Sequence, residues 1–450
     1  MRALLVRARM AAGSWPGPLL PLLRIRIQTS VSVTPRRASD DERERKTRRR
    51  RAVGRKKHLA CHAVLSLAAG GTGVAHAQSG VTIYGVIDVP FEYVNNQAQV
   101  APVINPVTGA VTRQAGGNKF SLEAAGGMSG SRWGIRGVED LGAGMKALFV
   151  LESGFAADSG QISRAGTIFG RLAFVGLQSD RLGQITLGRQ NTSMYETLGN
   201  FMPAKFAPLF EPTVALLGGT ASGGGLDNAV KYTAVAGPLT MKAHYSFGAG
   251  LSKFGLTPVA GQGAGEVPGH AKDNTAYGAG LMYLGAGLGL AVTYDQWNPA
   301  VVPGSTGTSK KLALAASYEL GRTKWMAGYR WGQNKDAAGG TLVRDNFWWT
   351  GFNYSATSAL TLTLGYYYDD RRTLKTNAAQ PDVNPVNPWQ LSFIADYALS
   401  RRTDVYFTVG YARNSGLNLD SPAIGFANGA FLGEGKNSQT GIATGIRHKF

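Results

Sequence analysis

Apolar and polar side chains alternate with a period of two along most of the chain from residue 80 to the C-terminus. Such alternation is typical of β-strands, because successive side chains point to opposite faces of a sheet. In the stretch 439–450, Ile442, Ile446 and Phe450 share one face, while small or basic residues occupy the other. The pattern predicts sixteen strands, at residues 80–94, 128–138, 144–155, 168–178, 183–190, 228–235, 239–248, 274–284, 288–297, 309–319, 322–332, 344–354, 359–370, 388–398, 403–413 and 439–450.

The connections between the predicted strands alternate between short and long. The short ones include residues 139–143, 179–182, 236–238, 285–287 and 320–321, and the long polar ones include 95–127, 191–227, 249–273 and 414–438. An even number of antiparallel strands, with turns at one end and long loops at the other, is typical of outer-membrane barrels. The spacing therefore predicts an all-β fold, a 16-stranded antiparallel transmembrane β-barrel with short periplasmic turns and long external loops.

One face of the predicted wall is charged and the other is apolar. In residues 144–155, for example, Lys146 and Glu152 alternate with Phe149 and Leu151. A ring of that many strands, at about 4.8 Å spacing and about 40° tilt, is roughly 32 Å across, which is too wide for side chains to fill. The lumen must then hold water, so we expect the charged face to point inward and the apolar face to meet lipid.

Large aromatic residues fall near the ends of several predicted strands. Aromatic girdles lie at the two membrane interfaces of such barrels, so we expect these side chains on the outer face there. The stretch 344–354 is ambiguous, because it carries aromatic residues on both faces. The residues expected in the girdles are Trp297, Trp325, Trp331, Trp389 and Tyr366, Tyr367 and Tyr368.

Composition agrees with many short strands and excludes a helical membrane protein. The 450 residues are 44% hydrophobic, and no run approaches the ~18 apolar residues of a spanning helix. The chain has 61 Gly beside 17 Tyr, 18 Phe and 8 Trp, a composition that suits strands joined by tight turns. With Cys61 as the single cysteine, no disulfide framework is possible.

The formal net charge of +19 belongs mostly to the N-terminal part of the chain. Residues 1–77 hold 17 Lys and Arg against 4 Asp and Glu, which leaves 30 basic and 24 acidic residues in 78–450. Residues 55–77 combine a basic start, an apolar run and an Ala-His-Ala end, so we predict a signal peptide cleaved after Ala77. Residues 1–54, with the Arg-rich run 43–51, are interpreted as a disordered gene-model extension, with translation beginning near Val53.

Several stretches are distinctive enough to indicate a family. Residues 78–88 read QSGVTIYGVID, 131–147 read SRWGIRGVEDLGAGMKA, 169–177 read FGRLAFVGL, 185–190 read ITLGRQ, 228–233 read NAVKYT and 445–450 read GIRHKF. Together they resemble the trimeric general porins of β-proteobacterial outer membranes, over nearly all of 78–450. The resemblance implies a homotrimer whose barrels each enclose a diffusion pore, narrowed by an inward-folded third loop, about 191–227. It also implies that the barrel-assembly machinery reads the terminal Phe450.

The candidate functional residues are charges expected to face the lumen. The basic set is Arg132, Arg136, Arg171 and Lys231, of which Arg132, Arg171 and Lys231 match constriction residues of the resembled family. The opposing acidic set is Asp88 on the first strand with Glu196, Glu211 and Asp227 on or beside the third loop. Such a transverse field sets ion preference, so we expect modest anion preference. Arg189 lies on the same face of its predicted strand as Ile185 and Leu187, which is the outward face, so it is expected at a loop or subunit contact and not in the pore.

An enzyme is not expected from the inventory of side chains. The predicted mature segment has only His244, His270 and His448, none with a metal-ligand spacing or a nucleophile motif. We therefore expect no cofactor, no metal and no nucleic-acid partner; the expected partners are outer-membrane lipid, lipopolysaccharide and the assembly machinery. Two alternatives to a general diffusion channel stay open: a substrate-specific channel, and a surface adhesin or antigen that uses the long loops.

Overall fold

The computed structural model describes residues 80–217, 224–249, 265–420 and 430–450. By its internal contacts the chain divides into two units, Met1–Thr72 and Gly73–Phe450, of which the first lies outside the described residues. The predicted extension, 1–54, and the predicted signal peptide, 55–77, also lie outside them. The fold below is therefore that of the second unit.

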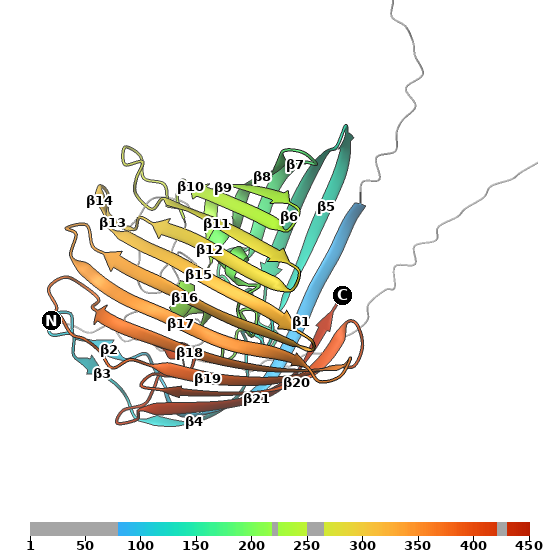
Figure 1. The fold of residues 1–450 in the computed structure, drawn as a ribbon. Coiled ribbons are helices and arrows are strands. Elements are labelled where there is room, and N and C mark those ends of the chain that lie inside the picture. Colours follow the sequence, from blue (N-terminus) through green and yellow to red (C-terminus); the bar gives the residue numbers. More distant parts are fainter. Residues whose placement is uncertain (1–79, 218–223, 250–264, 421–429) are drawn as a thin grey trace, which may run out of the picture. The chain divides into compact units, whose positions relative to one another are not determined.

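One antiparallel sheet closes on itself to form a barrel (Figure 1). From β5 to β21 each wall strand pairs with the next wall strand along the chain, and β1 pairs with β21 from Val86↔Lys449 to Val94↔Gly441, which completes the ring. Within the described residues the ring has sixteen positions, as predicted. The strands are β1 (Gly80–Ala98), β4 (Gly116–Leu122), β5 (Arg132–Gly142), β6 (Met145–Gly154), β7 (Leu172–Ser179), β8 (Gly183–Asn191), β9 (Gly225–Ala236), β10 (Leu239–Ser246), β11 (Ala276–Gly285), β12 (Leu288–Trp297), β15 (Thr308–Leu320), β16 (Thr323–Lys335), β17 (Thr341–Ser355), β18 (Leu360–Leu374), β19 (Trp389–Ala398), β20 (Thr403–Arg413) and β21 (Ser438–Lys449).

Strand β4 was not predicted, and it shares one position of the wall with β5. The first half of β1 pairs with β5, from Gly80↔Val138 to Val86↔Arg132. Its second half pairs with β4, from Phe91↔Leu122 to Ala98↔Gly116. Residues 123–131 interrupt the wall between them. Two small hairpins lie outside the ring's sheet: β2 (Val103–Ile104) with β3 (Val111–Thr112), and β13 (Ala300–Val302) with β14 (Ser305–Thr306).

The wall is apolar outside and polar inside, as the alternation predicted. On β12 and β15, Leu290 and Leu314 are 48% and 51% exposed, whereas Asp295 and Lys311 are 2% and 3% exposed. In a soluble protein this arrangement would be inverted, since it places apolar side chains outside and ionic groups within. Among the described residues, no helix has the length and apolar character needed to cross a membrane.

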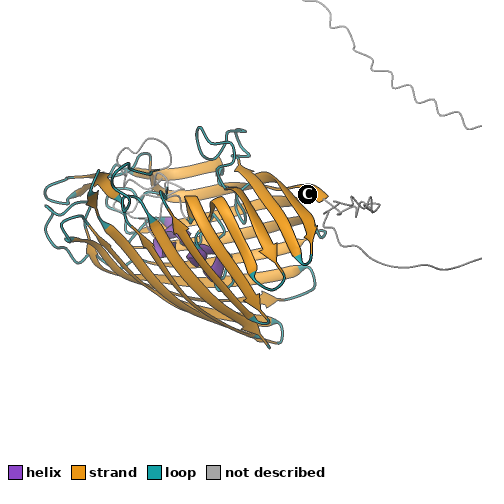
Figure 2. Ribbon diagram, turned by 90° about the horizontal axis from the view of Figure 1, so that it is seen from above, coloured by secondary structure: helices purple, strands orange, loops and turns teal. Residues whose placement is uncertain are grey.

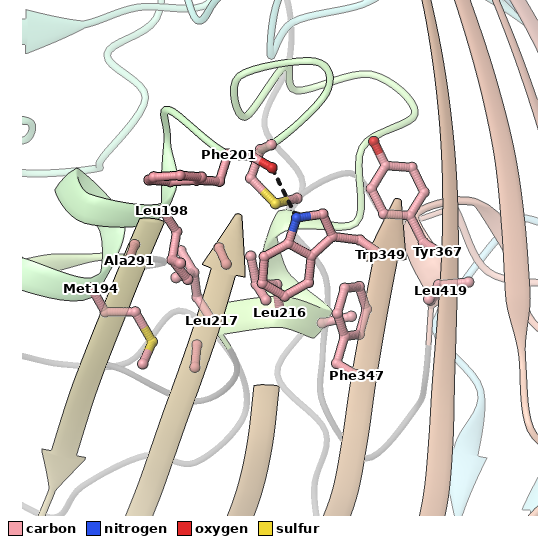
Figure 3. Close-up of a cluster of buried hydrophobic side chains, with 14 residues drawn as sticks. Met194, Leu198, Phe201, Leu216, Leu217, Ala291, Phe347, Trp349, Tyr367 and Leu419 are labelled. Atoms are coloured by element: carbon pink, nitrogen blue, oxygen red, sulfur yellow. Dashed lines mark hydrogen bonds between the residues drawn. The ribbon is translucent and has the colours of Figure 1, made fainter. Parts of the chain in front are cut away.

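The third long connection folds into the barrel, which confirms the predicted inward loop. We call its described residues, 192–217, the constriction loop; they carry helices α1 (Ser193–Leu198) and α2 (Thr213–Leu217), which lie inside the ring of strands (Figure 2). Its apolar residues pack against inward side chains of the wall, and the Trp349 Nε1–H donates to the Phe201 carbonyl at 2.9 Å (Figure 3). The packed cluster includes Met194, Leu198, Phe201, Met202, Leu216, Leu217, Ala291, Phe347, Trp349 and Tyr367.

Two of the residues expected in the aromatic girdles, Trp297 and Tyr367, point into the barrel instead. The structure also shows how the aromatic residues on the two faces of 344–354 are used. Trp297 is fully buried among inward residues of neighbouring strands, because the parity of β12 points it into the barrel. Tyr367 is also fully buried inside, whereas its neighbour Tyr366 is exposed outside. The two aromatic faces of β17 have different roles, since Phe347 packs on the loop and Trp348 is exposed on the outer face.

A second segment also enters the barrel. The 3-10 helix η1 (Leu417–Leu419) follows β20, and Leu417 and Leu419 are almost completely buried. Leu417 packs with Leu209 and Phe210 of the constriction loop. The last long connection was expected as an external loop, but its first residues rest on the constriction loop instead.

Candidate functional site

The constriction loop is tied to the wall at its start. The Thr192 side chain caps α1 by accepting from the Tyr195 N–H at 3.1 Å. The Ser193 N–H donates to His244 Nδ1 at 3.1 Å, and the Nε2 of the same ring lies 3.3 Å from Asp295 Oδ1. His244 is therefore a buried residue of β10 that anchors the start of the loop.

Two buried arginines hold the two inward segments. Arg330 Nε donates to the Leu216 carbonyl at 2.9 Å, and its Nη1 pairs with Asp345. Arg371 Nη2 donates to the Leu419 carbonyl at 2.8 Å, so Arg371 binds η1 as Arg330 binds α2. Because carbonyl oxygens at the ends of short helices lack intrahelical partners, cationic donors satisfy them well.

The tip of the constriction loop is organised around the Glu211 carboxylate. It accepts from the Ala204 N–H at 2.9 Å, from the Phe206 N–H, and from the Tyr367 hydroxyl at 2.8 Å. Complete burial raises the pKa of Glu211 to about 7, although these three donors oppose the shift. The turn they hold is unusual, because Lys205 and Phe206 have φ of 55° and 63°, which side chains other than glycine rarely adopt.

A cavity of about 390 Å³ lies between the loop tip and the wall, and we call it the luminal cavity. Arg132 and Arg171 contribute its basic side, with side chains 26% and 39% exposed. Both pair with Glu152, at 3.6 Å for the Arg132 Nε and 2.6 Å for the Arg171 Nε. Its lining also includes Ser129, Phe155, Tyr195, Lys205, Phe206, Pro208, Glu211, Thr213 and Asn418.

The other predicted basic residues lie elsewhere on the inner face. The Arg136 guanidinium lies 5.3 Å from the centre of the Tyr84 ring. Lys231 is 6% exposed, and its Nζ donates to Glu196 beneath α1. Lys242 also donates to Glu196, and the two lysines hold the pKa of this carboxyl below its usual value despite the opposing effect of burial. The charge of Lys231 is thus paired with the loop and is not presented to the luminal cavity.

Asp88 and Asp227, two acidic residues expected to line the pore, make contacts that hold the wall and its loops. Asp88 is fully buried, accepting from the Ser129 N–H at 2.7 Å and from the Tyr406 hydroxyl at 2.5 Å. Asp227 pairs with Arg164 at 3.2 Å and with Arg189, whose Nε donates to the Gly170 carbonyl. Arg189 is thus at a loop contact, the first of the two environments expected for it.

Sequence reasoning missed two charged residues at this site, Lys205 in the cavity lining and Glu152, which pairs with the two cavity arginines. The sequence pattern placed Glu152 on the inward face of its strand. Its contacts with Arg132 on β5 and with Arg171, the residue before β7, depend on how these strands align beside β6, which the pattern does not show. Lys205 is exposed at the loop tip, where no periodic pattern exists. The basic predictions Arg132 and Arg171 are brought together, and Glu211 lies with them as the anchor of the tip.

The three histidines of the predicted mature segment lie in different surroundings. His448 is exposed on β21 beside Thr403, and His270 lies in the connection before β11. Across the part of the chain that the structure describes, no group of three or more His, Cys, Asp or Glu could hold a metal ion.

Comparison with known proteins identifies relatives over nearly the whole described chain. A family model described as Gram-negative porin matches residues 63–417. An outer membrane porin protein of Bordetella pertussis is 30% identical over 415 residues, covering 86% of this chain and 98% of that protein. The anion-selective porin from Comamonas acidovorans superposes with a TM-score of 0.61 at 25% identity, covering 83% of this chain and 100% of its own. OmpT of Vibrio cholerae in a trimer form shares the fold, with a TM-score of 0.57 at 15% identity, covering 83% of this chain and 99% of its own.

Proposed function

The chain belongs to the Gram-negative porin family and is an outer-membrane channel protein, and on this premise we propose that small hydrophilic solutes and ions diffuse through its lumen with modest preference for anions. The family and the fold indicate a channel rather than an enzyme. The observation that carries the ion preference is the luminal cavity, which is lined by Arg132, Arg171 and Lys205 together with the buried Glu211, while Glu152 pairs with the two arginines. A similar structure is described as an anion-selective porin.

Basic charge in the narrow part of a pore favours anions because field lines concentrate where low-dielectric walls approach each other. The positions of Arg132 and Arg171 support this reading, since each retains an exposed part beside the loop tip. Arg136 adds positive charge deeper on the same face. In this proposal Lys231, Glu196, Asp88 and Asp227 act by fixing the loops and wall that shape the pore.

Reversal potentials of single channels in a salt gradient test the ion preference. The wild type should be more permeable to chloride than to potassium. Replacing both Arg132 and Arg171 by Gln should shift the reversal potential in the direction of greater cation permeability. The matched control is Arg322→Gln, a basic residue exposed at the turn between β15 and β16, which should leave the potential unchanged. Cation selectivity in the wild type would contradict the charge argument.

A homotrimer accounts for a difference between the two sides of the outer wall. On β9–β18, the exposed outward residues include many aromatic side chains, among them Tyr232, Tyr277, Trp325, Trp348 and Tyr366. On β5–β8, the large apolar side chains that are mostly exposed within the described residues are aliphatic, such as Val175, Leu177 and Leu187, while the outward rings of Trp133 and Phe149 are half-buried. Interfacial aromatic side chains mark walls that meet lipid headgroups. The aliphatic side therefore suits subunit contacts, and the aromatic side suits lipid and lipopolysaccharide.

The final residue has the contacts expected of a barrel-closing strand. Phe450 and Gly85 exchange backbone hydrogen bonds, each 3.1 Å long. Its ring is 45% exposed on the outer face, where assembly factors could contact it before the strand pairs. The assembly signal at Phe450 is part of the proposal.

Cleavage of the signal peptide after Ala77 is also part of the proposal. Mass spectrometry of the purified protein tests this cleavage, and the presence of peptides from residues 1–50 would contradict it.

A further inference from the structure

The luminal cavity contains aromatic surface that ion selectivity alone does not require. The rings of Tyr195 and Phe206 stack at 4.6 Å between centroids with an interplanar angle of 24°. Both rings line the cavity together with Arg132 and Arg171. Both rings also pack against the apolar cluster of the constriction loop, and the parts of them that line the cavity offer an apolar surface to a ligand.

The position of Phe206 is built into the fold of the loop tip. Its backbone, like that of Lys205, adopts the left-handed region, which is unfavourable for a bulky side chain. Glu211 maintains the turn by accepting from the Phe206 N–H and from the Ala204 N–H. Backbone strain of this kind persists where the surrounding structure fixes it, and it concentrates at binding sites.

The charges at the cavity complete an amphipathic site. Glu152 pairs with the Nε edges of Arg132 and Arg171, and Lys205 is exposed on the opposite side of the cavity at the loop tip. A guanidinium binds carboxylates through two parallel N–H donors, while an aromatic ring packs on another at 4.5–7 Å. The volume, about 390 Å³, lies within the range of small-molecule sites, roughly 300–1,000 Å³.

We propose that the luminal cavity binds carboxylates bearing a single aromatic ring, with the carboxylate at Arg132 and Arg171 and the ring against Phe206 and Tyr195. This inference rests on the proposed anion channel and narrows its preferred solutes. Such anions would be held transiently during passage, so they would compete with chloride for the same narrow zone.

Channel currents with matched solutes test the inference on the purified protein in planar lipid bilayers. The probes are benzoate, cyclohexanecarboxylate, which has the same charge without a π face, and benzamide, which has the ring without the charge. Benzoate should reduce chloride current saturably, at a concentration about fivefold lower than cyclohexanecarboxylate, because aromatic pairing contributes about 1 kcal/mol beyond buried area. Benzamide should have no saturable effect.

Variants separate the two halves of the site. Phe206→Leu and, independently, Tyr195→Leu should remove the difference between benzoate and cyclohexanecarboxylate, whereas Arg171→Gln should weaken both carboxylates. Tyr318→Leu, on the outer face, should leave every response as in the wild type. Equal effects of benzoate and cyclohexanecarboxylate on a conducting wild type would overturn this inference alone. A wild type without any chloride current would overturn the channel itself.

Discussion

At the scale of single residues, Glu211 couples the shape of the constriction loop to pH. Its carboxylate holds the tip through two backbone donors and Tyr367, in a fully buried position that raises its pKa from 4.5 to about 7. A carboxyl whose pKa is higher in the folded state binds more protons when folded. The folded loop is therefore favoured at low pH, and its stability declines as the pH rises from about 4.5 to about 7.

Replacing Glu211 by Gln should remove that dependence. The wild type should lose about 3 kcal/mol of stability between about pH 4.5 and pH 7 through this group, because each pKa unit corresponds to about 1.4 kcal/mol. In Glu211→Gln the thermal midpoint should change less between these pH values. The matched control is Glu319→Gln; the Glu319 side chain is 61% exposed, so its replacement should not alter how the thermal midpoint depends on pH. If the thermal midpoint of Glu211→Gln depends on pH as strongly as that of the wild type, the Glu211 carboxyl is not the source of the dependence.

Single residues also mark the limit of inference from sequence. Parity placed Arg132 and Arg171 on the inner face and the family resemblance placed Lys231 there, and in the structure all three lie on that face. Parity could not indicate that Lys231 would be covered by α1 and paired with Glu196, because the loop's path through the lumen leaves no periodic signal. For the same reason Lys205 and Phe206, which the luminal cavity depends on, were not candidates.

At the scale of elements, alternation located the wall strands because each has one face in lipid and one in water. Every predicted strand has its counterpart, and the missed β4 is short, follows a long loop and begins with two glycines. Trp297 and Tyr367 were misassigned because proximity to a strand end was given more weight than parity. Their inward parity was readable from neighbours such as Asp295 and Asp369.

The junction of β1 and β21 yields a prediction for assembly. A Cβ atom at Gly85 would lie 2.3 Å from the Phe450 ring and 2.7 Å from the Arg132 carbonyl. Gly85→Leu should therefore displace Phe450 and slow closure of the ring. Gly80→Leu, on the same strand with nothing within 4 Å, is the control. Folding into detergent or lipid, followed by the heat-modifiable gel shift of barrels, measures the rate. Equal rates for the two variants would contradict a role for this contact.

At the scale of the whole molecule, the outer surface determines what surrounds the barrel. If the aliphatic side at β5–β8 is the subunit interface, residues there should be shielded from lipid in the assembled protein. Val175 is 56% exposed and Leu314 is 51% exposed in the single chain, on opposite sides of this division.

Quenching by lipid distinguishes these two sides. Cys61 is the single cysteine of the chain and lies in the predicted signal peptide, so a fluorophore can be attached at Val175→Cys or Leu314→Cys. Brominated lipids should quench the label at position 314 strongly and the label at position 175 weakly. Strong quenching at both positions would show that the β7 face meets lipid and would remove the argument for subunit contacts there.

The paired arginine clamps make the two inward segments mechanically dependent. Arg330 holds α2 and Arg371 holds η1, while Asp345, the partner of Arg330, lies opposite Arg371 in the register of β17 and β18. Asn418 further joins η1 to the Pro208 carbonyl. A disturbance that frees one segment also removes support from the other. We therefore expect the two inward segments to loosen together and not one at a time.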